Sequence, residues 1–263
     1  MGTIPKFCKL VVCVFDSETR IITLMRSLLF SFFLLFTVCN DSAIAQAPSS
    51  FFNEADAFFG TYVANGKVDY SALAQNSESL DRLLAIAKTT TVTTQDPKSY
   101  QAFWINAYNL AVIKGVLEAY PIASPLDVSG FFDTKKFELA GSSVTLNDIE
   151  NKKLRAKFNE PRFHFVLVCG AIGCPPLISE AYTPSALESQ LQRQTVRALN
   201  DPKFIRLKGS QVELSEIFKW YKEDFVTARE NEIDFLNSFR REKLSAELTI
   251  AYYPYDWRLN SKN

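Results

Sequence analysis

The pattern of apolar and polar positions predicts helices in the first half of the chain. Apolar side chains recur at helical spacing over residues 51–63 and again over residues 80–86. The strongest helical stretch is residues 99–120, and Pro121 follows it as a stop signal. We expect this stretch to form one long central helix.

Hairpins and one apolar strand are predicted in the second half. Residues 137–139 and 144–146 flank a Gly-Ser-Ser turn, and residues 204–207 and 212–214 repeat the pattern. Residues 163–169 form an apolar run typical of a central strand. Further helices are expected at residues 147–155, 184–199, 215–225 and 232–239, with a last strand at residues 248–252. Without regular βαβ alternation, the class is α+β: a single domain with a mainly antiparallel sheet and hairpins packed against several helices.

The N-terminal region is expected to be a leader. Met25-Arg26-Ser27 precede a largely apolar block of 12 residues, 28–39, and the small-residue sites Ala43-Ile44-Ala45 and Ala45-Gln46-Ala47 follow. We predict a signal peptide at residues 25–47, cleaved near Ala45 or Ala47. A bilayer-spanning helix needs about 20 residues, so export is favoured over a stable membrane anchor. Residues 1–24 are interpreted as an upstream mis-start, with residues 48–263 as the mature protein, periplasmic or extracellular.

Charge and cysteine content narrow the chemistry. The predicted mature chain has 25 basic and 26 acidic side chains, a net charge of −1, which favours neither nucleic acid nor an anionic membrane as a partner. Cleavage leaves Cys169 and Cys174 as the two thiols in an oxidising compartment, where a disulfide is expected to be possible. Nucleotide-binding, serine-hydrolase and zinc-protease motifs are absent from the sequence, and we expect no cofactor.

Cys174 is the candidate nucleophile. It lies between Gly173 and Pro175, a setting that fixes the backbone and can expose the sulfur. The alternatives are a structural disulfide with Cys169, a buried inert thiol, or thiol–disulfide exchange by the pair, although their spacing is longer than Cys-x-x-Cys.

His164 is the single histidine of the chain. If residues 163–169 are extended, positions 164 and 169 lie about 16 Å apart and on opposite faces. This separation disfavours a Cys174–His164 dyad. It also disfavours a metal site formed by His164, Cys169 and Cys174 together. The remaining alternatives for His164 are a core histidine or a side chain that orients a carboxylate or amide.

Other polar and aromatic residues are candidates for a site. Asn106 and Asn109 share a helix face, where they can orient a substrate or an oxyanion, or satisfy the backbone of a buried loop. The carboxylates of Glu216, Asp224 and Asp256 can form an acid–base pair, or cap helices and pair with arginines such as Arg258. Five aromatic residues can either line a sugar- or peptide-binding groove or belong to the core. They are Trp104, Tyr108, Trp220, Tyr221 and Trp257.

Five strings of the sequence, in order, carry a family resemblance. They are Gly66-Lys67-Val68-Asp69-Tyr70, Phe103-Trp104-Ile105-Asn106-Ala107-Tyr108-Asn109, Phe165-Val166-Leu167-Val168-Cys169-Gly170 with Cys174-Pro175-Pro176-Leu177, Phe218-Lys219-Trp220-Tyr221-Lys222-Glu223-Asp224-Phe225, and Tyr255-Asp256-Trp257. Together they resemble the exported bacterial members of the domain of unknown function 547 family over nearly all of the mature chain. The family pattern resembles Ile-Glu-His at the position where this chain has Ile149-Glu150-Asn151. A role of that histidine in the family therefore does not carry over to Asn151.

Three functional hypotheses follow. The first is a thiol-dependent acyl-transfer or peptidase-like enzyme, with Cys174 as nucleophile, Asn106 or Asn109 orienting the loop or an oxyanion, and His164 or a carboxylate assisting. The second is a non-catalytic envelope module that binds peptide or glycan and carries a structural Cys169–Cys174 disulfide. The third is thiol–disulfide exchange.

Overall fold

The computed structural model describes residues 48–227 and 231–262. The predicted signal peptide, residues 25–47, and the segment before it, residues 1–24, lie outside the described residues. Within the described ranges, no helix combines the length and apolar character needed to cross a membrane.

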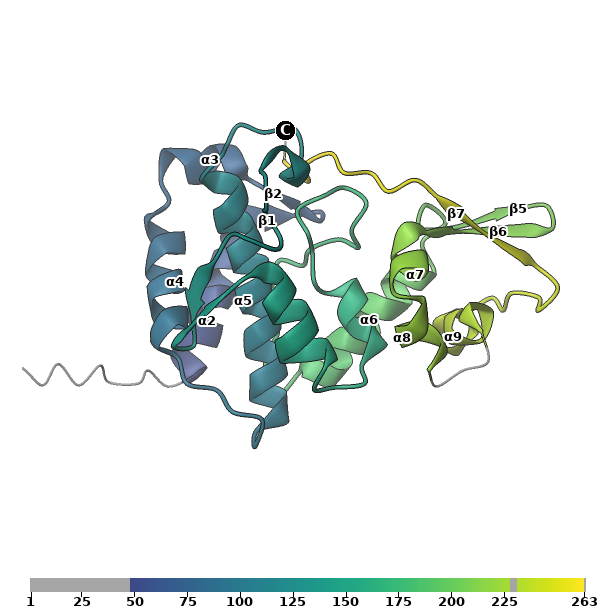
Figure 1. Ribbon diagram of the computed structural model, residues 1–263, viewed down its shortest axis with the longest axis horizontal. Coiled ribbons are helices and arrows are strands. Elements are labelled where there is room, and N and C mark those ends of the chain that lie inside the picture. Colours follow the sequence, from purple (N-terminus) through teal and green to yellow (C-terminus); the bar gives the residue numbers. More distant parts are fainter. Residues whose placement is uncertain (1–47, 228–230, 263) are drawn as a thin grey trace, which may run out of the picture. The chain divides into compact units, whose positions relative to one another are not determined.

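Three helices of the first half pack together, as Figure 1 shows. They are α2 (Pro48–Tyr62), α4 (Glu78–Thr89) and α5 (Pro97–Leu117). Asp96 caps α5 by accepting a hydrogen bond from the Ser99 amide at 3.1 Å, and Pro97 occupies the first turn, where its missing N–H costs nothing. Because 15 of the 21 residues of α5 are buried, it is a core helix with apolar surroundings on all sides. The predicted long central helix is confirmed.

Several short elements were not predicted. Strands β1 (Val63–Ala64) and β2 (Lys67–Val68) pair antiparallel around Asn65 and Gly66, whose φ values of 54° and 81° suit a tight hairpin turn. Helix α3 (Tyr70–Gln75) and the 3₁₀ turn η1 (Pro125–Asp127) complete this group.

In residues 48–227 and 231–262, the strands form three small sheets, of which the β1–β2 hairpin is one. Strand β3 (Phe137–Leu139) pairs antiparallel with β4 (Ser142–Val144). Strand β5 (Ile205–Lys208) pairs antiparallel with β6 (Gln211–Ser215), which pairs in parallel with β7 (Thr249–Tyr253). The α+β class is therefore confirmed, whereas the strands are divided among small sheets instead of one mainly antiparallel sheet.

The predicted central strand at residues 163–169 is wrong. The structure has a 3₁₀ helix there, η3 (Pro161–Phe165), followed by irregular chain that continues through Cys169 and the cysteine loop. Phe163, His164 and Phe165 are all buried. A run of buried residues occurs both in a central strand and in a buried turn, so the apolar pattern does not distinguish the two. Glu160 caps η3 by accepting from the Arg162 amide, and η3 packs against α6 (Leu187–Leu199).

The remaining helices carry most of the polar site residues. The predicted helix at residues 147–155 is a π-helix, η2 (Asp148–Arg155), which packs against α5. Such wide turns occur frequently at functional sites. The predicted helix at residues 215–225 is divided at Tyr221 into α7 (Glu216–Trp220) and α8 (Lys222–Val226), and α9 (Glu232–Phe239) has the predicted bounds.

Candidate functional site

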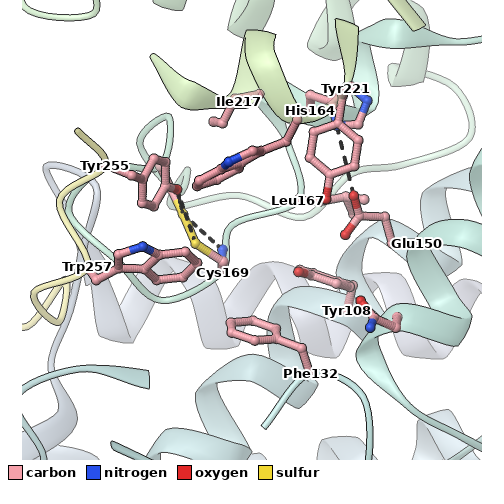
Figure 2. A pocket seen from close by; sticks show the side chains of 13 residues that line it. Tyr108, Phe132, Glu150, His164, Leu167, Cys169, Ile217, Tyr221, Tyr255 and Trp257 are labelled. Atoms are coloured by element: carbon pink, nitrogen blue, oxygen red, sulfur yellow. Dashed lines mark hydrogen bonds and ion pairs between the residues drawn. A yellow bond between two sulfur atoms is a disulfide. The ribbon is translucent and has the colours of Figure 1, made fainter. Parts of the chain in front are cut away.

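A pocket of about 260 Å³ brings together segments that are far apart in the sequence. Figure 2 shows side chains from α5, η2, η3 and α7 facing residues of the C-terminal segment across this pocket. Its aromatic lining consists of Tyr108, Phe132, Trp220, Tyr221, Tyr255 and Trp257. The pocket is therefore a largely apolar cavity with a few polar groups, as binding sites for small ligands usually are.

Cys169 and Cys174 both line this pocket, and they form a disulfide with Cα atoms 6.5 Å apart. The Cys169 amide donates to Cys174 Sγ at 3.0 Å, and the Tyr255 hydroxyl donates to the same sulfur at 2.9 Å. Tyr255 Oη also lies 3.2 Å from Cys169 Sγ. The disulfide predicted as one alternative is thus present, and in this state Cys174 has no free thiol.

The cysteine loop is held by the C-terminal segment through backbone hydrogen bonds. The Ile172 amide donates to the Arg258 carbonyl and the Gly173 amide to the Asp256 carbonyl, both at 2.8 Å. A Cβ atom at Gly173 would lie only 2.9 Å from the Asp256 nitrogen, so this close approach requires glycine. The loop geometry therefore depends on contacts made some 80 residues away in the sequence.

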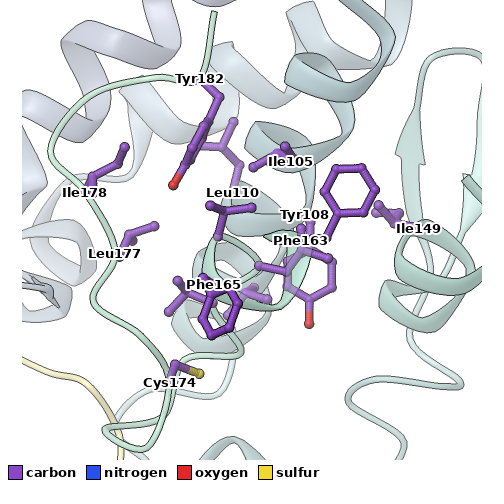
Figure 3. Close-up of a cluster of buried hydrophobic side chains, with 14 of the residues drawn as sticks. Ile105, Tyr108, Leu110, Ile149, Phe163, Phe165, Cys174, Leu177, Ile178 and Tyr182 are labelled. Carbon is purple, nitrogen blue, oxygen red and sulfur yellow. The ribbon is translucent and has the colours of Figure 1, made fainter. Parts of the chain in front are cut away.

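Asn106 and Asn109 hold the chain on the two sides of this loop. The Asn109 side chain donates to the Val166 carbonyl at 3.0 Å and accepts from the Val168 amide at 2.9 Å. Asn106 makes the same pair of bonds with the backbone of Tyr182, at 2.7 and 2.9 Å. Figure 3 shows the chain from Cys174 to Tyr182 running beside apolar side chains of α5. Both asparagines are buried, and neither lines the pocket.

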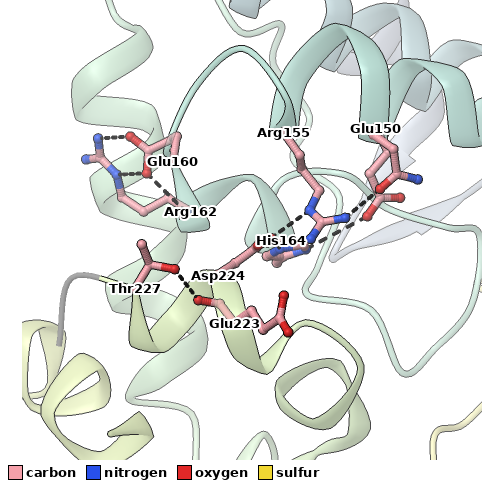
Figure 4. Close-up of polar contacts among 9 residues, drawn as sticks. Glu150, Arg155, Glu160, Arg162, His164, Glu223, Asp224 and Thr227 are labelled. Atoms are coloured by element: carbon pink, nitrogen blue, oxygen red, sulfur yellow. Dashed lines mark hydrogen bonds and ion pairs between the residues drawn. The ribbon is translucent and has the colours of Figure 1, made fainter. Parts of the chain in front are cut away.

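His164 belongs to a charged cluster at the wall of the pocket, drawn in Figure 4. Its Nε2 lies 2.7 Å from Asp224 Oδ2, and its Nδ1 lies 3.9 Å from Glu150 Oε1. Arg155 donates to both oxygens of Asp224, at 2.6 and 2.9 Å. Burial alone would raise the pKa of Asp224, but hydrogen bonds from His164 and Arg155 hold it well below its usual value. Asp224 is thus a carboxylate, which can only accept, so His164 Nε2 carries a proton and donates to it.

Aromatic rings enclose this cluster. Tyr221 stacks on the imidazole of His164 with ring centroids 4.1 Å apart, and the Arg155 guanidinium lies 4.8 Å from the centre of the same Tyr221 ring. Burial, and then the nearby charge of Glu150, raise the pKa values of Tyr221 and Tyr108. Both hydroxyls therefore stay protonated and available as hydrogen-bond donors.

The separation argued for His164 and the cysteines was wrong in its premise. Because His164 lies in a 3₁₀ helix and not in an extended strand, it lines the same pocket as Cys169 and Cys174. Its hydrogen-bond partner is nevertheless Asp224. In the part of the chain that the structure describes, no group of three or more His, Cys, Asp or Glu side chains is placed to hold a metal ion.

The other predicted site residues are divided between the pocket and its support. Tyr108 and Trp220 line the pocket, whereas Trp104 is in the core with 1% exposure. Glu216 accepts a hydrogen bond from the Tyr255 amide at 3.0 Å and so positions the Tyr255 backbone. Asp256 pairs with Arg258, which lowers the pKa of Asp256.

Six pocket residues were not among the predicted site residues: Phe132, Asn147, Glu150, Leu167, Ile217 and Tyr255. Tyr255 and Glu150 do lie in strings compared with the family, which could have drawn attention to them. Phe132 and Asn147 carry no local signal, because their position in the pocket results from packing.

The fold and the site define an α+β protein with an aromatic pocket, a disulfide in its lining and a histidine–carboxylate cluster at its wall. Residues 92–198 match the family described as "Protein of unknown function, DUF547", which confirms the predicted family over this segment of the chain. No curated protein and no solved structure matches the chain. The matched range includes Glu150, His164 and both cysteines, while Tyr255 and Trp257 lie beyond it.

Proposed function

We propose that this protein is a non-catalytic binding module that holds one ring-sized group of a glycan in the aromatic pocket. The observation that carries this proposal is the exposure of Trp220, which is 46% accessible although it lines the pocket. An aromatic side chain left open to solvent in a concave site is typical of a contact surface.

The geometry of the aromatic wall supports a flat ligand. The Trp220 and Trp257 rings lie 6.0 Å apart and within 27° of parallel, and Tyr255 packs against both. The C–H face of a sugar ring can lie against such a surface. Glu150 and Asn147, also in the lining, offer acceptors and a donor for the hydroxyl groups.

The charges at the wall fit a neutral ligand. Arg155 and Asp224 neutralise each other in a two-point ion pair, and His164 lies between Asp224 and Glu150. A glycan hydroxyl can bind here without bringing a charge that needs its own counterion.

Glycan binding requires no free thiol, so it is compatible with the disulfide, and the proposed export would carry the protein to a suitable compartment. A bridge between Cys169 and Cys174 persists in an oxidising environment, which supports the proposal of a periplasmic or extracellular location. The acyl-transfer hypothesis needs a free Cys174 thiolate and a base beside it. The acyl-transfer hypothesis therefore begins with reduction of this bond, whereas exchange uses the bond itself as a reactant.

Replacement of Trp220 tests the binding function. Calorimetric titration of the protein with a panel of oligosaccharides and peptides should identify a glycan that binds, and Trp220→Ala should weaken it about tenfold, or about 1.4 kcal/mol, by removing the exposed face. Leu207→Ala is the matched control, because Leu207 is 56% exposed on β5 and lies outside the pocket lining. A panel without any binding glycan, or equal affinities for both variants, would contradict the proposal; a bound peptide would replace glycan with the other ligand class.

A further inference from the structure

The two sulfur atoms of the disulfide have different surroundings. Cys174 Sγ accepts two hydrogen bonds, from the Cys169 amide at 3.0 Å and from the Tyr255 hydroxyl at 2.9 Å. Cys169 Sγ has one polar contact, with the same hydroxyl at 3.2 Å. Since a hydroxyl has a single proton, Tyr255 donates it to the nearer sulfur, Cys174.

These donors favour negative charge on Cys174 once the bond is broken. Hydrogen bonds to the charged form of a group stabilise that form, and an amide and a hydroxyl both donate here. Tyr255 is a dependable donor, because its burial raises the pKa of its hydroxyl. Burial disfavours a thiolate at either cysteine. The titratable side chains of Glu150, His164, Tyr108 and Tyr221 line the same pocket as both sulfur atoms. The two donated hydrogen bonds are the contacts that distinguish Cys174 from Cys169.

The exposure of the two residues favours Cys169 as the cysteine that an external thiol attacks. Cys169 is partly buried and packs at the edge of the core, whereas Cys174 is 8% exposed. Both residues line the pocket, and Cys169 is the more exposed residue of the pair.

The donors do not depend on the disulfide for their positions. The loop is held by the bonds from Ile172 and Gly173 to the C-terminal segment, and the Asn260 amide donates to the Gly170 carbonyl at 2.9 Å. Glu216 holds the Tyr255 backbone independently. Reduction therefore leaves the two donors beside Cys174.

We propose that the Cys169–Cys174 pair is a redox-active disulfide, in which an external thiol attacks Cys169 and Cys174 leaves as the stabilised thiolate. The incoming thiolate forms a bond to Cys169 Sγ while the Cys169–Cys174 bond breaks, and the electron pair of that bond goes to Cys174. A second external thiolate then attacks the external sulfur of the mixed disulfide and releases Cys169. In sum, two external thiols are oxidised to one disulfide, and their two protons and two electrons reduce the cysteine pair. This activity goes beyond glycan binding and does not depend on it.

Two measurements on the purified protein test the roles of the sulfurs, in a background with Cys8→Ser, Cys13→Ser and Cys39→Ser. The first equilibrates the protein with reduced and oxidised glutathione and quantifies the free thiols by alkylation. We expect the pair to change its redox state within the range of these buffers. A pair that stays oxidised throughout is a structural bridge, which overturns the proposal and leaves the binding function intact.

The second measurement follows the rate of iodoacetamide alkylation with pH. Cys169→Ser isolates Cys174 and keeps the amide donor, while Cys174→Ser isolates Cys169. Cys174 should react at the lower pH midpoint, and Tyr255→Phe should raise that midpoint by about one to two pH units because one hydrogen bond to the thiolate is lost. Tyr253→Phe is the matched control, since its hydroxyl donates to the Phe204 carbonyl instead. Equal or reversed midpoints for the two cysteines would overturn the assignment, whether or not Tyr255→Phe folds.

Discussion

At the residue scale, two asparagines in the central helix determine how the cysteine segment is attached. Asn109 pairs with the backbone of Val166 and Val168, and Asn106 with that of Tyr182. Irregular chain that is buried has no ladder partners, so its amides and carbonyls need side chains to bond with. The primary amide, which both donates and accepts, supplies the two bonds from one residue.

Removal of one of these amides should destabilise the protein. Asn109→Ala leaves the Val166 carbonyl and the Val168 amide buried without their partner, and we expect it to lower the free energy of unfolding by about 1–3 kcal/mol. Urea denaturation followed by circular dichroism measures the change. Asn53→Ala on the exposed face of α2 is the control and should change stability little. Equal effects of the two substitutions would show that the backbone bonds of Asn109 are unimportant.

At the scale of elements, one ion-pair cluster joins three short helices. Arg155 comes from η2, His164 from η3 and Asp224 from α8, and the three side chains meet at Asp224. Each of these helices has eight residues or fewer, too short to be stable by itself. Their contacts with each other and with the core therefore determine the wall of the pocket.

This cluster predicts a loss of stability in acid. The pKa of Asp224 in the folded protein is below its ordinary value of 3.8, so its contribution is present above about pH 4 and is lost as the pH falls further. The free energy of unfolding of the wild type should consequently fall more steeply between about pH 4 and pH 2 than that of Asp224→Asn.

Chemical denaturation at a series of pH values measures this difference. The control is Asp133→Asn, an exposed carboxylate outside the cluster, which should keep the wild-type slope. If Asp224→Asn kept that slope as well, the cluster would make no linked contribution to stability.

At the scale of the whole molecule, the last residues of the chain complete the pocket. Tyr255 and Trp257 form part of its lining, and the Asn260 carbonyl accepts from the Val68 amide at 2.9 Å while its side chain accepts from the Tyr70 hydroxyl at 3.2 Å. The C-terminal segment thus contacts both the cysteine loop and the N-terminal hairpin. The pocket requires the described chain from α5 to this segment.

Truncation of the C-terminal segment should show how much it contributes to the stability of the protein. A chain that ends at Tyr253 loses both aromatics and the bonds of Asn260, and we expect its melting temperature to fall by about 10 °C or more. A chain that ends at Asn260 keeps them and should melt near the wild type. Calorimetry compares the two, and a full-stability protein ending at Tyr253 would show that the segment is only an accessory.

The sequence predicted those parts of the fold that depend on near neighbours. Helical spacing indicated α2, α4 and α5, and turn residues indicated the hairpins β3–β4 and β5–β6. The cysteine pair was predicted as a possible disulfide because both thiols were expected in an oxidising compartment, and the bond is present. The apolar composition of residues 163–169 predicted a strand, and this prediction was wrong. A run that is buried on all sides has no polar–apolar periodicity that could distinguish a strand from a turn.

By itself, then, the sequence determined the α+β class, the main helices and the residue types capable of chemistry, because each depends on local spacing or on the side chain alone. Only the tertiary structure decided which of them meet. It brought His164 to the same cavity as the cysteines, placed Glu150 and Tyr255 in its lining and left Trp104 in the core. The physical reason is that the pocket is formed by contacts between residues distant in sequence, whose adjacency follows from packing the whole chain around α5.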